Sequence, residues 1–192
     1  MGLIVKFRDL FTGKKEKTWL DMTPAEKRVR LAQDVIANLK LKIIVAEQGS
    51  YAKFDEDLKD EIDIKDYDKQ ANKYLSAEKP CQVCAMGALF IADVMERNDL
   101  KVITLVGGRT DGDNVAHRLE GVFEQHQLRL IETAFEKQVI DTDDDDLYDS
   151  YEGEDTPLAE NAINFGEHFP NAEKRLIAIM ENIISNEGEF IP

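Results

Sequence analysis

The sequence predicts a mainly α-helical protein, a single compact helical domain over residues 1–192 with room for a small β element. Apolar residues recur at helical spacing in several segments. Capping residues stand where those segments begin and end. The chain is 43% hydrophobic over 192 residues, enough to fill one core, and it contains no internal repeat.

The first predicted helix begins at Pro24, because proline fits the first helical position. Thr23 can cap this helix, and Glu26 can complete a capping box with it. Residues 41–46 either extend the helix or form a short strand, and Gly49 ends the segment in both cases. The apolar residues of the helix share one face: Val29, Ala32, Val35, Ile36 and Leu39.

Residues 51–79 are polar and predict a long connection, with a short helix around residues 67–75. A second helix is predicted to begin at Pro80. Its interior is small and apolar, which is typical of a central, buried helix. Three of its residues would let a neighbouring helix come close: Ala85, Gly87 and Ala88.

In the second half of the chain, residues 102–108 predict a short strand and residues 109–114 a solvent-exposed turn or, less commonly, a polar site. A helix follows through residues 126–137, another starts at Thr156, and the last runs from the cap Asn171 to Gly188. Two apolar faces are expected to point inward: Leu128, Ile131, Ala134 and Phe135 in the first of these helices, and Leu176, Ile177, Met180, Ile183 and Ile184 in the last.

Charge is the most unusual property of the sequence. The net charge is −15, and residues 141–160 contain ten acids without a single base. A negative field of this kind repels nucleic acids and anionic membranes and attracts cations and basic proteins. We therefore expect neither direct nucleic-acid binding nor membrane binding. Residues 1–40, with nine bases against five acids, could meet the acidic run within or between molecules.

We interpret residues 141–156 first as a solvated, flexible loop within the domain, because like charges repel and little apolar surface is present. In the leading hypothesis this loop steers a non-enzymatic interaction protein to a partner with a basic surface, and binding weakens with salt. The predicted partner-binding residues are Asp141, Asp143, Asp144, Asp145, Asp146, Asp149 and Glu152.

The same run predicts a divalent-cation site as an alternative. Acids stand at positions one, three, five, nine and twelve of a twelve-residue loop, the carboxylate spacing of an EF-hand: Asp141, Asp143, Asp145, Asp149 and Glu152. Calcium is the cation this spacing fits, and no other cofactor is expected. Asp146 stands where glycine is usual, and Gly153 and Pro157 interrupt the helix that should follow.

A third interpretation of the run is mimicry of DNA, since closely spaced carboxylates can imitate a phosphate backbone. Proteins of that kind usually spread their acids over a whole rigid face, whereas here they cluster in one segment.

Cys81 and Cys84 offer a further alternative, a thiol-dependent enzyme. They follow Pro80 at a predicted helix start, where the helix dipole lowers the pKa of a thiol. A redox motif of this class needs a strand before the helix, and zinc needs two more ligands. The only histidines, His117, His126 and His168, do not form a second closely spaced pair of ligands. A packing role is therefore favoured for the two cysteines.

The order of an N-terminal helix, a Gly-Ser-Tyr-Ala turn at residues 49–52 and a Cys-Ala-x-Gly-Ala-Leu helix at residues 84–89 resembles small uncharacterised proteins of bacteria and their phages. The resemblance covers residues 25–95. It implies a cytoplasmic, phage-encoded accessory protein and no activity that could be transferred residue by residue.

The sequence also predicts a cytoplasmic location. The first apolar patch, "MGLIVKFRDLF", is too short and too soon charged for a secretory signal. No window reaches the roughly 18 apolar residues that a transmembrane helix needs.

Overall fold

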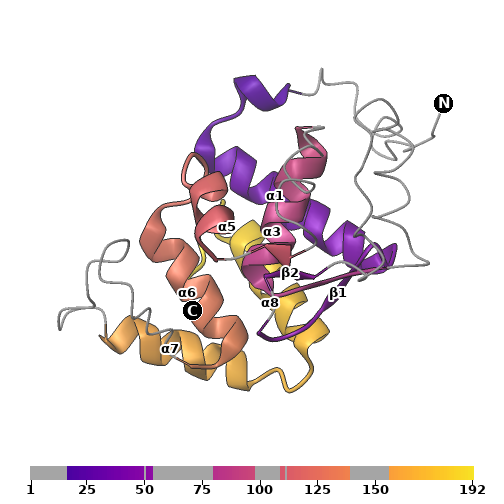
Figure 1. Cartoon of the computed structure of the whole chain (residues 1–192). Helices are drawn as coiled ribbons and strands as arrows, with labels where there is room; N and C mark the ends of the chain where they lie inside the picture. Colours follow the sequence, from indigo (N-terminus) through magenta and orange to yellow (C-terminus); the bar gives the residue numbers. More distant parts are fainter. Residues whose placement is uncertain (1–16, 50, 54–79, 98–108, 111, 139–155) are drawn as a thin grey trace.

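The computed structural model describes residues 17–49, 51–53, 80–97, 109–110, 112–138 and 156–192. These residues form a mainly α structure with a small β element, as the sequence predicts (Figure 1). A 3-10 turn, η1 (Trp19–Asp21), precedes the first helix. The helices are α1 (Pro24–Lys40), α3 (Ala85–Glu96), α5 (Gly112–Leu119), α6 (Gln125–Glu136), α7 (Thr156–Glu167) and α8 (Ala172–Ser185).

Helix α1 begins at the predicted capping box. The Glu26 amide donates to the Thr23 hydroxyl at 3.2 Å, and the Thr23 amide donates to the Glu26 carboxylate at 2.9 Å. A cap of this kind stabilises a helix by about 1 kcal/mol. The predicted apolar face points inward, with Val29 and Ile36 half-buried at its margin. The buried residues are Leu31, Ala32, Val35, Asn38 and Leu39.

Residues 41–46, where the sequence leaves helix and strand open, contain strand β1 (Ile44–Ala46). Lys42, with a φ of 57°, turns the chain out of the helix just before it. One sheet with the order β1-β3-β2-β4 is formed. Strand β3 (Cys81–Val83) pairs in parallel with β1 and antiparallel with β2 (Ala52–Lys53), which pairs antiparallel with β4 (Arg109–Thr110).

The prediction that a helix begins at Pro80 is wrong. Residues 81–83 form an inner strand, with Cys81 and Val83 buried and Gln82 half-buried between them. Helix α3 begins only after its N-cap residue, Cys84. Three alternating residues before a long apolar run are too few to predict a strand from the sequence. Residues 81–83 adopt the strand conformation because they pair with both neighbouring strands, β1 and β2.

Helix α3 lies at the centre of the molecule, and every residue from Ala85 to Val94 is buried (Figure 1). At Gly87, the expected close approach of a helix is replaced by that of a turn. A Cβ atom at Gly87 would lie 1.2 Å from the carbonyl oxygen of Tyr51, the residue before β2. Gly87 is therefore needed for the sheet connection to reach α3.

The expected turn at residues 109–114 is also corrected at its described positions, because Arg109 and Thr110 form β4 and α5 begins at Gly112. The following helices begin as predicted: α7 starts at Thr156, and the Asn171 side chain caps α8 by accepting from the Lys174 amide at 3.1 Å. The expected inward residues of α6 and α8 are all buried or half-buried. The predicted strand at 102–108 and helix at 67–75 lie outside the described residues.

One continuous cluster of buried hydrophobic side chains joins the described helices to the sheet. Helix α1 packs against α8 and α3, and α6 packs against α7, α3 and α8. Within the described part of the chain, no helix combines the length and apolar character needed to cross a bilayer.

Candidate functional site

Residues 141–155 of the acidic run lie outside the described residues, whereas residues 156–160 belong to α7. The structure therefore defines the candidate site by the two helix ends that flank residues 139–155. All the predicted partner-binding and cation-binding residues fall in the undescribed segment: Asp141, Asp143, Asp144, Asp145, Asp146, Asp149 and Glu152. The described chain leaves off after Gln138, two residues beyond α6, and resumes at Thr156, the first residue of α7.

Helices α6 and α7 lie side by side with their C-terminal ends together (Figure 1). A Cβ atom at Gly166, near the end of α7, would lie 2.0 Å from the carbonyl oxygen of Ala134, near the end of α6. The described chain therefore leaves off at Gln138, beside the C-terminal ends of this helix pair, and resumes at Thr156, the opposite end of α7. Since α7 has 12 residues, the two attachment points are separated by about 18 Å, the length of that helix.

A buried arginine fixes the end of the helix pair from which the run departs. Arg175 of α8 is 0% exposed and donates through Nε to the carbonyl oxygens of Gly166 and Phe169, at 3.1 Å each, and through a terminal nitrogen to that of Phe135. Carbonyl groups in the last turn of a helix lack intrahelical donors. One guanidinium thus satisfies carbonyls at the ends of both α6 and α7.

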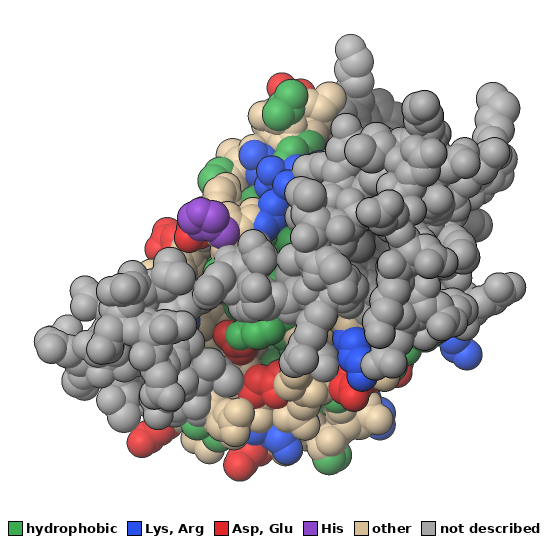
Figure 2. Space-filling view, in the orientation of Figure 1, with side chains coloured by type: hydrophobic (Ala, Val, Ile, Leu, Met, Phe, Trp, Pro, Cys, Tyr) green, Lys and Arg blue, Asp and Glu red, His purple; other side chains and the backbone are tan. Residues whose placement is uncertain are grey.

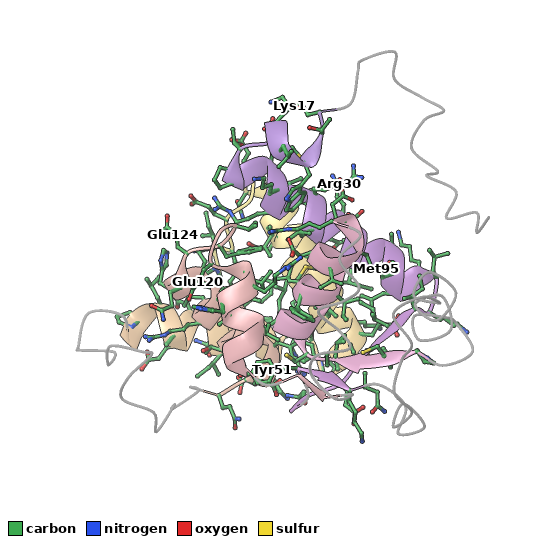
Figure 3. The ribbon with its side chains drawn as sticks, turned by 45° about the horizontal axis from the view of Figure 1, so that its top comes forward. Lys17, Arg30, Tyr51, Met95, Glu120 and Glu124 are labelled. Carbon is green, nitrogen blue, oxygen red and sulfur yellow. The ribbon has the colours of Figure 1, made fainter. Side chains whose placement is uncertain are left out.

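Two carboxylates of α6 hold the turn between β1 and β2 against the same helix end. The Gly49 amide donates to both carboxylate oxygens of Glu136, at 3.1 and 3.2 Å. The Tyr51 hydroxyl donates to the carboxylate of Glu132. The side-chain amide of Gln48 adds a bond of 3.1 Å to the Glu136 carbonyl oxygen. Figure 3 shows Tyr51 at the lower end of the molecule, beside the strands.

The pKa values of both carboxyl groups are raised. Burial is the largest cause for Glu132, and the neighbouring Glu136 charge adds to it, whereas the Tyr51 hydroxyl lowers the pKa. Burial likewise raises the pKa of Glu136 against the opposing effects of the Gly49 amide and the Arg175 guanidinium. Ionised carboxylates are disfavoured where hydration is lost and a like charge is near.

The cysteines occupy different elements from those the sequence predicts. Cys81 lies in β3 and Cys84 is the N-cap of α3, and both thiols are buried. Burial raises the pKa of Cys81 to about 12. Burial also raises the pKa of Cys84, and the charges of Glu132 and Glu136 raise it further. The lost hydration outweighs the helix N-terminus, so both thiols are protonated at neutral pH.

Several basic side chains of the N-terminal part of the chain are engaged by the described body itself. Their partners are Glu26 for Lys17 at 2.6 Å, Asp34 and Glu96 for Arg30 at 3.3 Å each, and the Gly188 and Val122 carbonyl oxygens for Arg28 at 2.6 and 2.9 Å. In Figure 3, Lys17 and Arg30 lie along the upper part of the molecule, away from Tyr51. These contacts hold the basic groups within the α1 region of the body.

The described residues together are close to electrical neutrality. They contain 17 acids and 14 bases, a net charge of −3, whereas the whole chain has −15. Figure 2 shows acidic and basic side chains interspersed on the described part of one face. Residues 141–155 alone contain nine acids and no base, so they account for most of the remaining negative charge.

Sequence reasoning missed the buried charged residues, although their positions carry a signal. Glu132 shares a helical face with Leu128 and Phe135, and Arg175 precedes Leu176 on the buried face of α8. A charged residue on an apolar face is rarely buried without a partner. Asp93 of α3 follows the same rule: it is 0% exposed and accepts from two arginines, Arg97 at 2.8 Å and Arg118 at 2.7 Å.

Among the side chains that the structure describes, no group of three or more His, Cys, Asp or Glu residues is placed to hold a metal ion. The three histidines are exposed: His117, His126 and His168. Comparison with protein-family models, with curated proteins and with solved structures finds no match to this chain.

Proposed function

We propose that the protein is a non-enzymatic acidic interaction protein, of the accessory or inhibitor kind, that binds a basic protein surface through its acidic segment. One observation carries the proposal: residues 141–155 contain nine acids and no base, while the described body has a net charge of only −3. The body acts as a scaffold to which the segment is attached at both ends.

The electrostatics of such a segment favour association with cations. A cluster of like charges attracts an oppositely charged surface over about one Debye length, which is about 8 Å at physiological ionic strength. Attraction of this kind raises the association rate and depends steeply on salt. Lys17, Arg28 and Arg30 have partners within the body, which favours an external partner for the acids.

The test is affinity capture from the native host with two variants of equal net charge. In the first variant, six aspartates or glutamates of the segment are neutralised: Asp141→Asn, Asp143→Asn, Asp144→Asn, Asp145→Asn, Asp149→Asn and Glu152→Gln. The matched control neutralises six exposed acids of the body: Glu47→Gln, Glu120→Gln, Glu124→Gln, Glu167→Gln, Glu181→Gln and Glu189→Gln.

We expect the wild type and the control to capture the same protein, identified by mass spectrometry, and the segment variant to lose it. Elution by salt is expected because the attraction is screened. Equal capture by all three proteins would remove the segment from the proposal. A captured protein whose DNA binding is displaced by the chain would identify mimicry of DNA as the form of the interaction.

Calcium binding is retained as a second candidate because of the carboxylate spacing. The twelfth position of such a loop, here Glu152, supplies two oxygens to the cation. Titration calorimetry with calcium is therefore expected to show binding to the wild type and a large loss in a Glu152→Gln variant. The absence of heat and of any melting shift at millimolar calcium would rule this candidate out.

A further inference from the structure

We propose that residues 189–191 occupy a peptide-binding site formed by α6, α7 and α8, and that this site accepts an extended segment of another protein that carries an aromatic residue. In this structure the chain's own segment makes the main-chain contacts and the aromatic contact that define the site. The site lies in the described body, so the inference is independent of the acidic segment's partner.

Two side-chain amides bind the main chain of residues 190 and 191. The Phe190 amide donates to Oε1 of Gln127 on α6 at 2.7 Å, and Nε2 of Gln127 donates to the Phe190 carbonyl oxygen at 3.4 Å. Asn182 of α8 pairs with Ile191 in the same way, at 2.9 Å to the Ile191 amide and 2.7 Å to its carbonyl oxygen. A side-chain amide has both a donor and an acceptor, as a peptide group does. These pairs can therefore form with any residue other than proline.

The Asn182 amide is held in position by its own helix end. The Asn186 side chain donates to Oδ1 and to the carbonyl oxygen of Asn182, at 3.0 Å each. Because Oδ1 accepts from Asn186 in this way, its orientation does not depend on Ile191 alone. A polar group that is ordered before a ligand arrives lowers the entropy cost of binding. Asn182 is therefore a preformed part of the site.

One aromatic side chain anchors the segment. Phe190 is 1% exposed and meets the Phe165 ring of α7 edge to face, with the ring centroids 5.3 Å apart. The neighbouring side chains of Glu189 and Ile191 are exposed. Main-chain hydrogen bonds combined with pockets for single side chains are the means by which proteins recognise extended peptides. The site therefore selects one aromatic residue and tolerates variation on either side of it.

The chain's own segment leaves room for a better occupant. The 3.4 Å bond from Gln127 is longer than the usual N–H···O distance, and Ile191 is 55% exposed. The turn before the segment also requires a φ of 54° at Glu187, a conformation that is disfavoured for a residue with a Cβ atom. A segment of another protein can improve these contacts and leaves Glu187 free to relax. Exchange between two copies of the chain would only reproduce the same contacts.

Fluorescence anisotropy with a labelled synthetic peptide of residues 186–192 tests the site on the full chain. An attached segment competes with the peptide at an effective concentration in the millimolar range or above. Phe190→Ser weakens this competitor, so we expect it to bind the peptide at least about tenfold more tightly than the wild type does. The matched control is Ile191→Ser, which keeps the aromatic anchor and should bind as the wild type does.

The contacts themselves are tested in the Phe190→Ser background. Adding Gln127→Ala removes both bonds to the aromatic residue of the peptide and should weaken peptide binding about tenfold. A peptide in which alanine replaces the phenylalanine should not bind. If Phe190→Ser is folded and binds no peptide, or binds both peptides equally, the inference is overturned.

A measurement on the wild type keeps the test decisive if Phe190→Ser does not fold. Unlabelled peptide at millimolar concentration should shift the Phe190 and Ile191 amide NMR signals towards those of a released segment, while the buried Val35 of α1 stays unchanged. In that case, Phe190 and Ile191 signals that remain fixed would overturn the inference. Self-association of the wild type that Phe190→Ser abolishes would overturn the assignment to another protein, because a second copy would then supply the segment.

Discussion

Replacing Gly87 by alanine should destabilise the protein because the new methyl group has no room. Its Cβ would lie 1.2 Å from the Tyr51 carbonyl oxygen and 2.3 Å from the carbonyl carbon, and these are backbone atoms that no side-chain rotation can move away. The turn would have to shift away from α3. That shift would also stretch the bonds from Gln48 and Gly49 to Glu136.

The size of the destabilisation follows from two unfavourable contributions and one favourable contribution. Overpacking costs about 1–3 kcal/mol, two weakened hydrogen bonds cost about 1 kcal/mol each, and the better helix propensity of alanine returns about 1 kcal/mol. The free energy of unfolding should therefore fall by about 3 kcal/mol, which lowers the melting temperature of a chain this size by about 6–12 °C.

Urea unfolding followed by circular dichroism measures this change. Gly121→Ala is the matched control, because a Cβ atom there meets nothing within 4 Å. We expect that control to lie within about 1 kcal/mol of the wild type. If Gly87→Ala is as stable as Gly121→Ala, the close packing of the turn on α3 is not as described.

Two substitutions and one labelling experiment probe the buried charges and thiols. Arg175→Met should lower stability by about 3 kcal/mol or more, since it removes three buried hydrogen bonds to carbonyl oxygens at the ends of α6 and α7, whereas the exposed neighbour Lys174→Met should be nearly neutral in the same urea titration. Asp93→Asn should cost a similar amount, about 3 kcal/mol, because two arginines lose their shared anion; an unchanged unfolding midpoint would contradict the buried pairing. Cys81 and Cys84 should resist iodoacetamide at pH 8 in the native state and react in denaturant, and rapid native labelling would refute their burial.

The sequence predicts those elements whose signals are local. The capping box at Thr23, the start of α7 at Thr156 and the cap at Asn171 are all confirmed, because a cap depends on residues only three positions apart. The inward faces of α6 and α8 are confirmed as well, since helical periodicity persists over three or more turns.

The elements that were missed depend on partners distant in sequence. Residues 81–83 form a strand because β1 and β2 pair with them. A segment of three residues carries no sequence pattern from which that pairing could be predicted. Helix α5 was not predicted because its first turn contains Gly112, Asp113 and Asn114, residue types that commonly form loops. Glu132 and Glu136 could be placed on a helix, but the turn that they contact comes from more than 80 residues earlier.

The salt dependence of binding tests the central claim, that recognition resides in the acidic segment and not in the nearly neutral body. The measurement is the Kd of the captured protein at increasing salt for the wild type, the segment variant and the body variant with six neutralised glutamates. We predict a steep loss of affinity with salt for the wild type and the body variant, and weak, salt-independent binding for the segment variant. Identical curves for all three proteins would contradict the account.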